Sequence, residues 1–249
     1  MVTRPFALQC WLAAAVLAFV PSSRAQSEPP TAEAILLQME STYAGLRSYR
    51  DTSTAQFRNP DGSEGTHAEF KIWFSRPKFF RIDATTRRSA DAKPVREVMW
   101  FDGETARMWS TRTPVVTRTK IQLAGSKMFG TYAYHVPTLL EASYAGPRRL
   151  HQLGSPTLAG DEAIDGVDCY HLSGEWQGDP YEVWIGKEDH LVRKIAANYK
   201  GYVMEEVHRD ITTNQPMDMS AFRFAPEEEG APPRKGTPPP RLPGERARP

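Results

Sequence analysis

The stretch Lys71–Asp83, KIWFSRPKFFRID, indicates the fold class of this 249-residue chain. Ile72 and Phe74, then Phe80 and Ile82, occupy alternate positions on either side of an Arg-Pro step. A period of two is typical of a β-strand with one apolar face, and proline marks the turns between strands. The stretch therefore predicts two strands that meet at a turn and share an apolar face.

The same period continues along most of the chain. Strands are expected at 48–57, 66–75 and 78–85, and a hairpin at 95–110. Four later stretches alternate in the same way between Asp, Gly, Pro and Asn turns, namely 164–176, 181–187, 191–199 and 202–213. We expect roughly ten strands and no internal repeat.

Two segments have the three- and four-residue spacing of helices. The first begins at Thr31, a good N-cap, and extends for about sixteen residues with apolar side chains at Ile35, Leu36, Met39, Tyr43 and Leu46. The second, VPTLLEASYAG (136–146), is expected to be short and to begin after Pro137. The predicted fold class is mainly β (α+β), a curved antiparallel sheet with helices against its apolar face.

The first 25 residues have the composition of an export signal. Arg4 precedes the apolar run Trp11–Val20, and the small residues Ser23 and Ala25 occupy the positions that a signal peptidase requires. The run is too short to span a bilayer, which takes about twenty residues. We expect cleavage after Ala25 and a periplasmic mature protein without a transmembrane segment. A buried N-terminal helix is the alternative.

Export changes the charge and the cysteine content. Without Arg4 and Arg24 the chain has 29 basic and 30 acidic residues, a balance that does not favour nucleic acid as a partner. Cys10 is lost with the signal, so Cys169 has no partner for an intrachain disulfide.

The C-terminal residues differ in composition from the domain before them. Pro226–Pro249 contains eight prolines in 24 residues and one large aliphatic residue, Leu242. Such a segment buries too little apolar surface to fold. We expect a signal peptide at 1–25, one domain at 26–226 and a disordered tail at 227–249. The PPPRLP sequence in the tail either docks in a polyproline-binding groove or is part of a spacer.

The apolar face of the sheet is the candidate ligand site. Each of its side chains gains about 1.5–3 kcal/mol if fully buried. A solid core and a ligand cavity both satisfy that requirement, and the pattern leaves both open. The expected lining residues are Phe70, Ile72, Phe74, Phe80, Ile82 and Trp100 from the strands, and Leu36 and Met39 from the helix.

A catalytic site is poorly supported by the sequence. Cys169 and His171 share one face of a strand, but no third group is placed to orient them, and a free cysteine in a strand is usually a small core residue. No Gly-rich phosphate loop or serine nucleophile elbow occurs. We therefore expect no enzyme activity and no cofactor.

A metal site is also poorly supported. The six histidines lack HExxH or CxxC spacing, and solvent-exposed strand positions explain them, although a site built from His171, His208 and Asp210 stays open. The acidic run DEAIDGVD (161–168) reads as a hairpin turn, because it lacks the ligand alternation of a calcium loop.

The order of several short stretches resembles a known family. They are SYRDTSTAQF (48–57), DGSEG (61–65), AEFKIWFSRPKFFRID (68–83), WFDGETARMWS (100–110) and NQPMDMSAFRFAP (214–226). In this order they resemble the outer-membrane lipoprotein carriers of the LolA and LolB type, and more closely their lipoprotein-sorting and DUF2092-type relatives. The resemblance covers residues 31–226.

The resemblance implies an incomplete β-barrel, closed by helices as a lid, around an apolar cavity that holds acyl chains of a lipoprotein. It also implies a role for the arginine of the W-x-x-R-P stretch, here Arg76, in holding the lid closed when the cavity is empty. A guanidinium has donors in a fixed fork that suit the carbonyls at a helix end. The alternative is that Arg76 ends a strand and pairs with a surface acid.

Two functions follow from the sequence. The first is a periplasmic carrier or binding protein for lipoprotein acyl chains or another lipid, with an envelope protein of the inner or outer membrane as a possible partner. The second is a regulatory module of the same fold, which binds an anti-sigma factor and senses envelope lipids. A gene for an anti-sigma factor or for a lipoprotein exporter beside this one would separate them.

Overall fold

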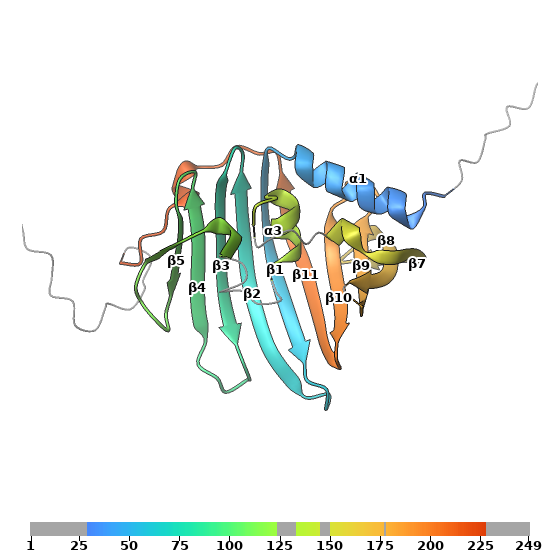
Figure 1. Cartoon of the computed structure of the whole chain (residues 1–249), viewed down its shortest axis with the longest axis horizontal. Helices are drawn as coiled ribbons and strands as arrows, with labels where there is room; N and C mark the ends of the chain where they lie inside the picture. The colour runs from blue at the N-terminus through green and yellow to red at the C-terminus, as the bar shows by residue number, and fades with distance from the viewer. Residues whose placement is uncertain (1–28, 124–132, 145–149, 177, 228–249) are drawn as a thin grey trace, which may run out of the picture.

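The computed structural model of the protein describes residues 29–123, 133–144, 150–176 and 178–227. These residues form one antiparallel sheet with the strand order β6-β5-β4-β3-β2-β1-β11-β10-β9-β8-β7 (Figure 1). The strands are β1 (Ser48–Arg58), β2 (Glu64–Ser75), β3 (Phe79–Arg87), β4 (Val95–Asp102), β5 (Ala106–Ser110), β6 (Thr117–Thr119), β7 (Gly154–Ile164), β8 (Val167–Trp176), β9 (Asp179–Gly186), β10 (Val192–Tyr199) and β11 (Tyr202–Thr213).

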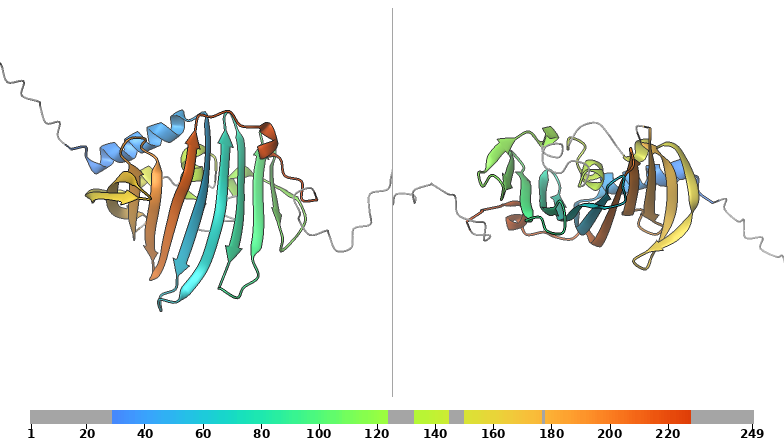
Figure 2. Two further views of the ribbon diagram at one scale, coloured as in Figure 1. Left: turned by 180° about the vertical axis from the view of Figure 1, so that it is seen from behind. Right: turned by 90° about the horizontal axis from the view of Figure 1, so that it is seen from below.

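The sheet is curved and open. Seen along its strands it forms a trough (Figure 2), and β6 and β7 lie at its two edges without pairing with each other. All other consecutive strands are neighbours, and at the centre the first strand, β1, pairs with the last, β11. The expected fold class, a curved antiparallel sheet that forms an incomplete barrel, is confirmed.

Helices cover the concave face of the trough. α1 (Ala32–Gly45) lies across one end of the strands, and α3 (His135–Leu140) lies over the middle (Figure 1). The hydroxyl oxygen of Thr31 accepts a hydrogen bond from the backbone N–H of Ala34 at 3.2 Å, which confirms Thr31 as the N-cap of α1. The structure also has two short 3-10 helices, η1 (Leu150–Gln152) and η2 (Met219–Phe222).

The register of β2 and β3 confirms the alternation in Lys71–Asp83. Ile72 is opposite Ile82 and Phe74 is opposite Phe80, so their side chains share the concave face. All four are at most 1% exposed, and they pack in one cluster with the buried side of α1. The apolar face predicted from the sequence is therefore covered by helix side chains.

A second, smaller core lies on the convex face. Val98, Trp100 and Trp109 pack there around Phe224, which follows η2. Trp100, expected among the residues of the concave face, belongs to this second core, so that expectation is wrong. The apolar run Val98–Trp100 is buried on both faces of β4, and Met99 is the residue that points into the trough.

The elements differ from the sequence predictions in three places. The described residues contain eleven strands where roughly ten were expected, and the short β6 and the edge strand β7 correspond to none of the expected segments. α3 begins at His135, two residues before Pro137. The hairpin turn in the acidic run is limited to residues 165–166, and its other acidic residues lie in strands. The expected signal peptide and nearly all of the expected tail lie outside the described residues.

Candidate functional site

The floor of the candidate site is the apolar concave face, and α1 is part of its cover. Leu36 and Met39 of α1 are at most 2% exposed and lie in the same cluster as Phe70. Tyr43, one turn further, is fully buried, and its hydroxyl oxygen accepts a hydrogen bond from the backbone N–H of Val192 at 3.2 Å. Except for Trp100, the expected lining residues are brought together on one face.

Arg76 connects the β2–β3 turn to the C-terminal end of α1. Its Nε donates to the carbonyl oxygen of Leu46 at 3.1 Å, and its Nη2 donates to that of Ala44 at 3.0 Å. The guanidinium also lies 4.9 Å from the ring centre of Phe74. A cation at the carbonyl end of a helix is stabilised by unpaired carbonyl groups and by the helix dipole. The structure thus places Arg76 at a helix end rather than against a surface acid.

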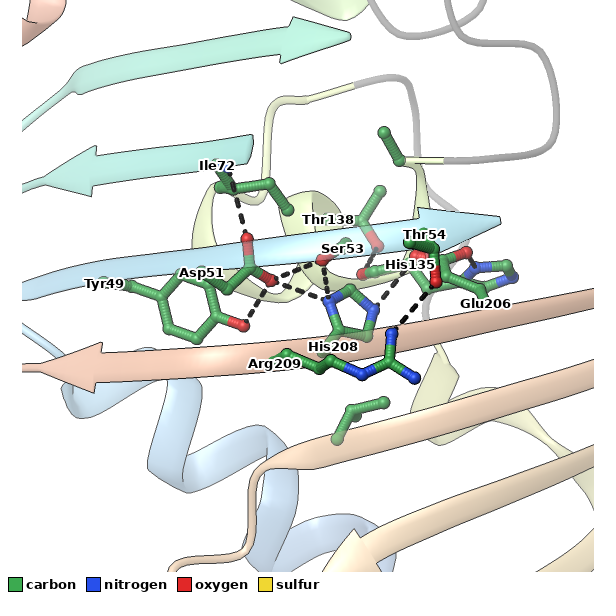
Figure 3. Close-up of polar contacts among 12 residues, drawn as sticks. Tyr49, Asp51, Ser53, Thr54, Ile72, His135, Thr138, Glu206, His208 and Arg209 are labelled. Atoms are coloured by element: carbon green, nitrogen blue, oxygen red, sulfur yellow. Dashed lines mark hydrogen bonds and ion pairs between the residues drawn. The ribbon is translucent and has the colours of Figure 1, made fainter. Parts of the chain in front are cut away.

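A chain of buried polar side chains crosses the middle of the concave face (Figure 3). We call it the buried polar chain, and its members come from β1, β11 and α3: Asp51, Ser53, Glu206, His208 and His135. None of these five residues is more than 1% exposed. Charged groups at such depth are retained only when they are paired and hydrogen-bonded.

Asp51 is fully hydrogen-bonded. Its Oδ2 accepts from the hydroxyl of Tyr49 at 2.8 Å, from the hydroxyl of Ser53 at 2.9 Å and from Nδ1 of His208 at 2.7 Å. Its Oδ1 accepts from the backbone N–H of Ile72 at 3.2 Å. The four donors occupy the acceptor capacity of a carboxylate.

His208 lies between two carboxylates. Its Nδ1 lies 2.7 Å from Oδ2 of Asp51, and its Nε2 lies 3.0 Å from Oε1 of Glu206. Burial alone lowers the pKa of His208, but the hydrogen bonds and charges of Asp51 and Glu206 outweigh it and raise the pKa to about 9. The ring is therefore an imidazolium at neutral pH.

Glu206 connects His208 to the cover. Its Oε2 accepts a hydrogen bond from Nδ1 of His135 on α3 at 2.9 Å. Burial alone raises the pKa of Glu206, but the interactions with His135 and His208 outweigh it and lower the pKa to about 2. A hydrogen bond to a buried charged group contributes roughly 1.5–3 kcal/mol, so this contact holds α3 to the sheet.

His135 is the outermost member of the buried polar chain. Its ring lies 5.2 Å from that of Trp176 and 5.9 Å from that of Tyr181, measured between ring centres. Its Nε2 is buried and has no hydrogen-bond partner among the described residues. The hydroxyl of Thr138 donates to the carbonyl oxygen of His135 at 2.8 Å and so stabilises the first turn of α3.

A β-bulge helps to place the charged side chains. Arg50 pairs with Thr212 and Thr52 pairs with Arg209, so two residues of β11 stand opposite Asp51. One of them, Asp210, has φ of 52°, a left-handed conformation that suits such an irregularity. The bulge therefore lies opposite Asp51 and within two residues of His208.

The buried polar chain has the residue types of a catalytic triad but not its chemistry. Ser53 Oγ and Asp51 both contact Nδ1 of His208, and Glu206 is at the other ring nitrogen. An imidazolium between two carboxylates has no free lone pair with which to accept a proton from serine. Within the described part of the chain, no three His, Cys, Asp or Glu side chains are arranged to hold a metal ion.

The other sites considered from the sequence are not assembled. His171 stacks on Trp184 with ring centres 4.3 Å apart, on a different strand from the buried His208. The Cys169 thiol donates to the carbonyl oxygen of Val167, and burial raises its pKa, which disfavours the reactive thiolate. The expectation of solvent-exposed histidines is wrong for His135 and His208, which are 1% exposed.

A hollow of about 440 Å³ lies on the convex face, over β1 to β4. It is lined by polar and charged side chains, among them Lys71, Arg81 and Arg96, with Asp83 paired to both arginines. Its chemistry differs from that of the apolar concave face. No helix in the described part of the chain has the length and apolar character needed to cross a membrane.

Comparison with solved structures gives distant likenesses. LprF from Mycobacterium bovis is 14% identical, with 76% of this chain and 95% of that chain covered and a TM-score of 0.48. A LolA superfamily protein from Nitrosomonas europaea is 12% identical, with 79% and 99% covered and a TM-score of 0.37. MucB in its complex with MucA(peri) is 15% identical, with 79% and 60% covered and a TM-score of 0.45.

Comparison with protein sequences gives a clearer result. No curated protein matches the chain. One family does match, over residues 32–231, and its description is "Predicted periplasmic protein (DUF2092)". The match includes every described strand and α1. The chain therefore belongs to the DUF2092 family of predicted periplasmic proteins.

Proposed function

We propose that the protein is a periplasmic binding protein that holds an apolar ligand, such as the acyl chains of a lipoprotein or another lipid, against the concave face of its sheet. The observation that supports this most is the nature of the cover. α1 and α3 lie over an apolar face that the buried polar chain crosses at its middle, and they are not part of its strand pairing. Such a cover can move while the sheet stays intact.

The energetics of replacing α1 by a ligand on the concave face favour an acyl chain as that ligand. Moving α1 away exposes the apolar face, and each methylene of a ligand buried there recovers about 0.8 kcal/mol. The two hydrogen bonds from Arg76 to the end of α1 break on opening and re-form on closing. They are directional contacts at an exposed position, so they set the closed geometry at a small energetic cost.

Binding of this kind needs no chemical step. Selectivity comes from the shape of the apolar face and from a few polar groups near it. We therefore propose a binding or carrier role without catalysis, in the cell envelope and in the service of lipoprotein sorting or lipid transport.

Native mass spectrometry tests the proposal. The exported protein is purified from the periplasm without detergent, its intact mass is compared with the mass after denaturation, and its lipids are extracted. We expect bound acyl chains at near-stoichiometric amounts. A protein that is empty and also fails to bind a fluorescent fatty alcohol contradicts the proposal.

One observation favours the regulatory alternative. Met39 and Tyr43 of α1 are fully buried against the concave face, so the described residues already form a filled core. If the protein proves empty, its interior is ordinary core and its outer surface becomes the functional part. A periplasmic protein partner, such as an anti-sigma factor, is then the proposed ligand.

A further inference from the structure

The two carboxylates of the buried polar chain differ in how well they are satisfied. Asp51 accepts four hydrogen bonds from neighbours on the sheet. Glu206 has two polar contacts, a hydrogen bond from His135 to its Oε2 and an ion pair of 3.0 Å between its Oε1 and Nε2 of His208. Glu206 therefore keeps acceptor capacity that no described residue uses, although its side chain is fully buried.

The position of Glu206 indicates which group would use its spare hydrogen-bond acceptor capacity. Its donor His135 belongs to α3, which covers the concave face, whereas Asp51 and His208 belong to the sheet itself (Figure 3). If α3 moves to admit a ligand, Glu206 loses the nitrogen of His135. The charges left on the floor are then those of Asp51, Glu206 and the imidazolium of His208, a net charge of −1 in apolar surroundings.

A buried carboxylate that loses its donor must find another. Water is one source, but an acyl chain that fills the trough excludes water from the floor. We propose that the ligand is a long-chain lipid whose polar end donates hydrogen bonds, such as an amine or an amide, and that this end replaces His135 at Glu206. The inference rests on the proposed function and names the class of its ligand.

The net negative charge of Asp51, Glu206 and His208 also disfavours one class of ligand, the lipids with an anionic end. A lipid that ends in a carboxylate or a phosphate would place a second anion beside Glu206, where the low dielectric strengthens repulsion. Such a lipid binds well only with its polar end outside the trough. Free fatty acids are accordingly poor ligands compared with amines and amides of equal chain length.

A competition experiment tests this inference. Oleylamine, oleamide and oleic acid share one chain and differ at the polar end, and each displaces a fluorescent fatty alcohol from the protein at neutral pH. We expect the amine and the amide to bind the native protein about tenfold more tightly than the acid, since hydrogen bonds to charged groups are the stronger ones. Equal affinities for all three overturn the inference.

A matched pair of variants assigns the effect to Glu206. Glu206→Gln removes the charge inside the trough, and Glu205→Gln removes the same charge from the next residue of β11, which is exposed and paired with Lys194 on the opposite face. We expect Glu206→Gln to abolish most of the preference for the amine over the acid, and Glu205→Gln to leave it unchanged. The same loss in both variants contradicts the inference.

A variant on the cover keeps the test decisive if Glu206→Gln does not fold. His135→Leu removes the donor with which the ligand competes, so affinity for oleylamine should rise while affinity for the fatty alcohol changes little. A fall in amine affinity contradicts the inference. If no probe binds to the native protein, the proposed function itself is wrong, which is a different result from binding without preference.

Discussion

At the scale of single residues, the main finding is a set of ionised side chains where the sequence predicts an apolar surface. Asp51, His208 and Glu206 lie on the concave face, in phase with the buried Tyr49 and Met204 on the same strands. Burying charge costs free energy, and the mutual contacts recover it only while all partners are present. The buried polar chain therefore makes the centre of the sheet sensitive to single substitutions.

Replacing His208 should destabilise the fold strongly. His208→Gln leaves Asp51 and Glu206 as buried carboxylates without a cation between them, and we expect a loss of about 3–5 kcal/mol in the free energy of unfolding. Urea unfolding measures it. The control is Arg209→Gln, which breaks an exposed ion pair with Asp165 and should cost at most about 1 kcal/mol. Similar losses in the two variants would show that the buried polar chain adds little to stability.

The same residues predict how stability depends on pH. The pKa of His208 is raised in the folded state, so its contribution is complete below about pH 6.5 and is lost as the pH rises through about 9. The pKa of Glu206 is lowered, so its contribution is complete above about pH 4.5 and is lost as the pH falls through about 2. Unfolding measured across pH should show both declines. An alkaline decline that persists unchanged in His208→Gln would assign it to another group.

The sequence predicts the apolar residues of the floor better than the polar ones. Phe70 and Ile72 alternate with the charged Glu69 and Lys71, so the sequence indicates which face of this strand points inward. Asp51 and Glu206 look like surface residues, and only their phase with Tyr49 and Met204 indicates that they point inward. Asp51 and Glu206 are brought to one site because β1 pairs with β11. The paired residues are about 150 positions apart in the chain, so no local pattern in the sequence reveals this pairing.

At the scale of elements, α1 and α3 are attached to the sheet in different ways. α1 covers the floor with apolar side chains and is fixed at its C-terminal end by Arg76. α3 is fixed by a buried hydrogen bond from Nδ1 of His135 to Glu206. The contact of α1 is exposed and the contact of α3 is not, so moving α1 costs less than moving α3, which leaves Glu206 in need of another donor.

Replacing Arg76 tests the attachment of α1. Arg76→Leu removes two hydrogen bonds to the last carbonyls of the helix, and hydrogen exchange of α1 amides should become about tenfold faster. If these bonds also drive closure onto an empty site, the variant should retain more bound lipid than the native protein. Lys78→Leu, an exposed position on the same turn, is the control. Unchanged hydrogen exchange of the α1 amides and unchanged lipid content in Arg76→Leu would show that Arg76 does not hold α1 closed.

The helices were predicted with unequal success. The apolar spacing of α1 is regular and its N-cap is a threonine, so its start is correct. α3 has only six residues, too few for a spacing to show, and Pro137 suggested a later start than His135. Pro137 lies within the first turn, where the missing N–H costs nothing. Strand ends were predicted well because Asp, Gly and Pro mark most turns.

At the scale of the whole molecule, the segment after β11 joins the two faces of the sheet. It leaves the centre at Asn214, whose side chain accepts a hydrogen bond from the backbone N–H of Arg47 at 2.8 Å. It then passes through η2 and places Phe224 between Trp100 and Trp109 on the convex face. The chain thereby fixes β4 and β5 from outside.

Removing the ring of Phe224 should loosen the part of the sheet that contains β4 and β5. Phe224→Ala deletes an aromatic ring that is 6% exposed, and we expect a loss of about 3–5 kcal/mol in the free energy of unfolding. Tryptophan fluorescence is a direct reporter, because the ring centres of Trp100 and Trp109 lie 5.3 and 5.2 Å from that of Phe224. Met219→Ala, at a 42% exposed position of the same segment, is the control and should change little. A loss of unfolding free energy in Met219→Ala but not in Phe224→Ala would refute the role of Phe224 in fixing β4 and β5.

The pairing of β1 with β11 constrains the order of events during synthesis. The centre of the sheet pairs the first strand with the last. The two halves of the sheet, β1 to β6 and β7 to β11, therefore stay unpaired with each other until the chain has been synthesised as far as residue 213. Pairings this distant in sequence form slowly, because loop closure must precede any gain in contacts. The strand order that builds the trough therefore also delays completion of the fold until nearly all of the domain has been synthesised.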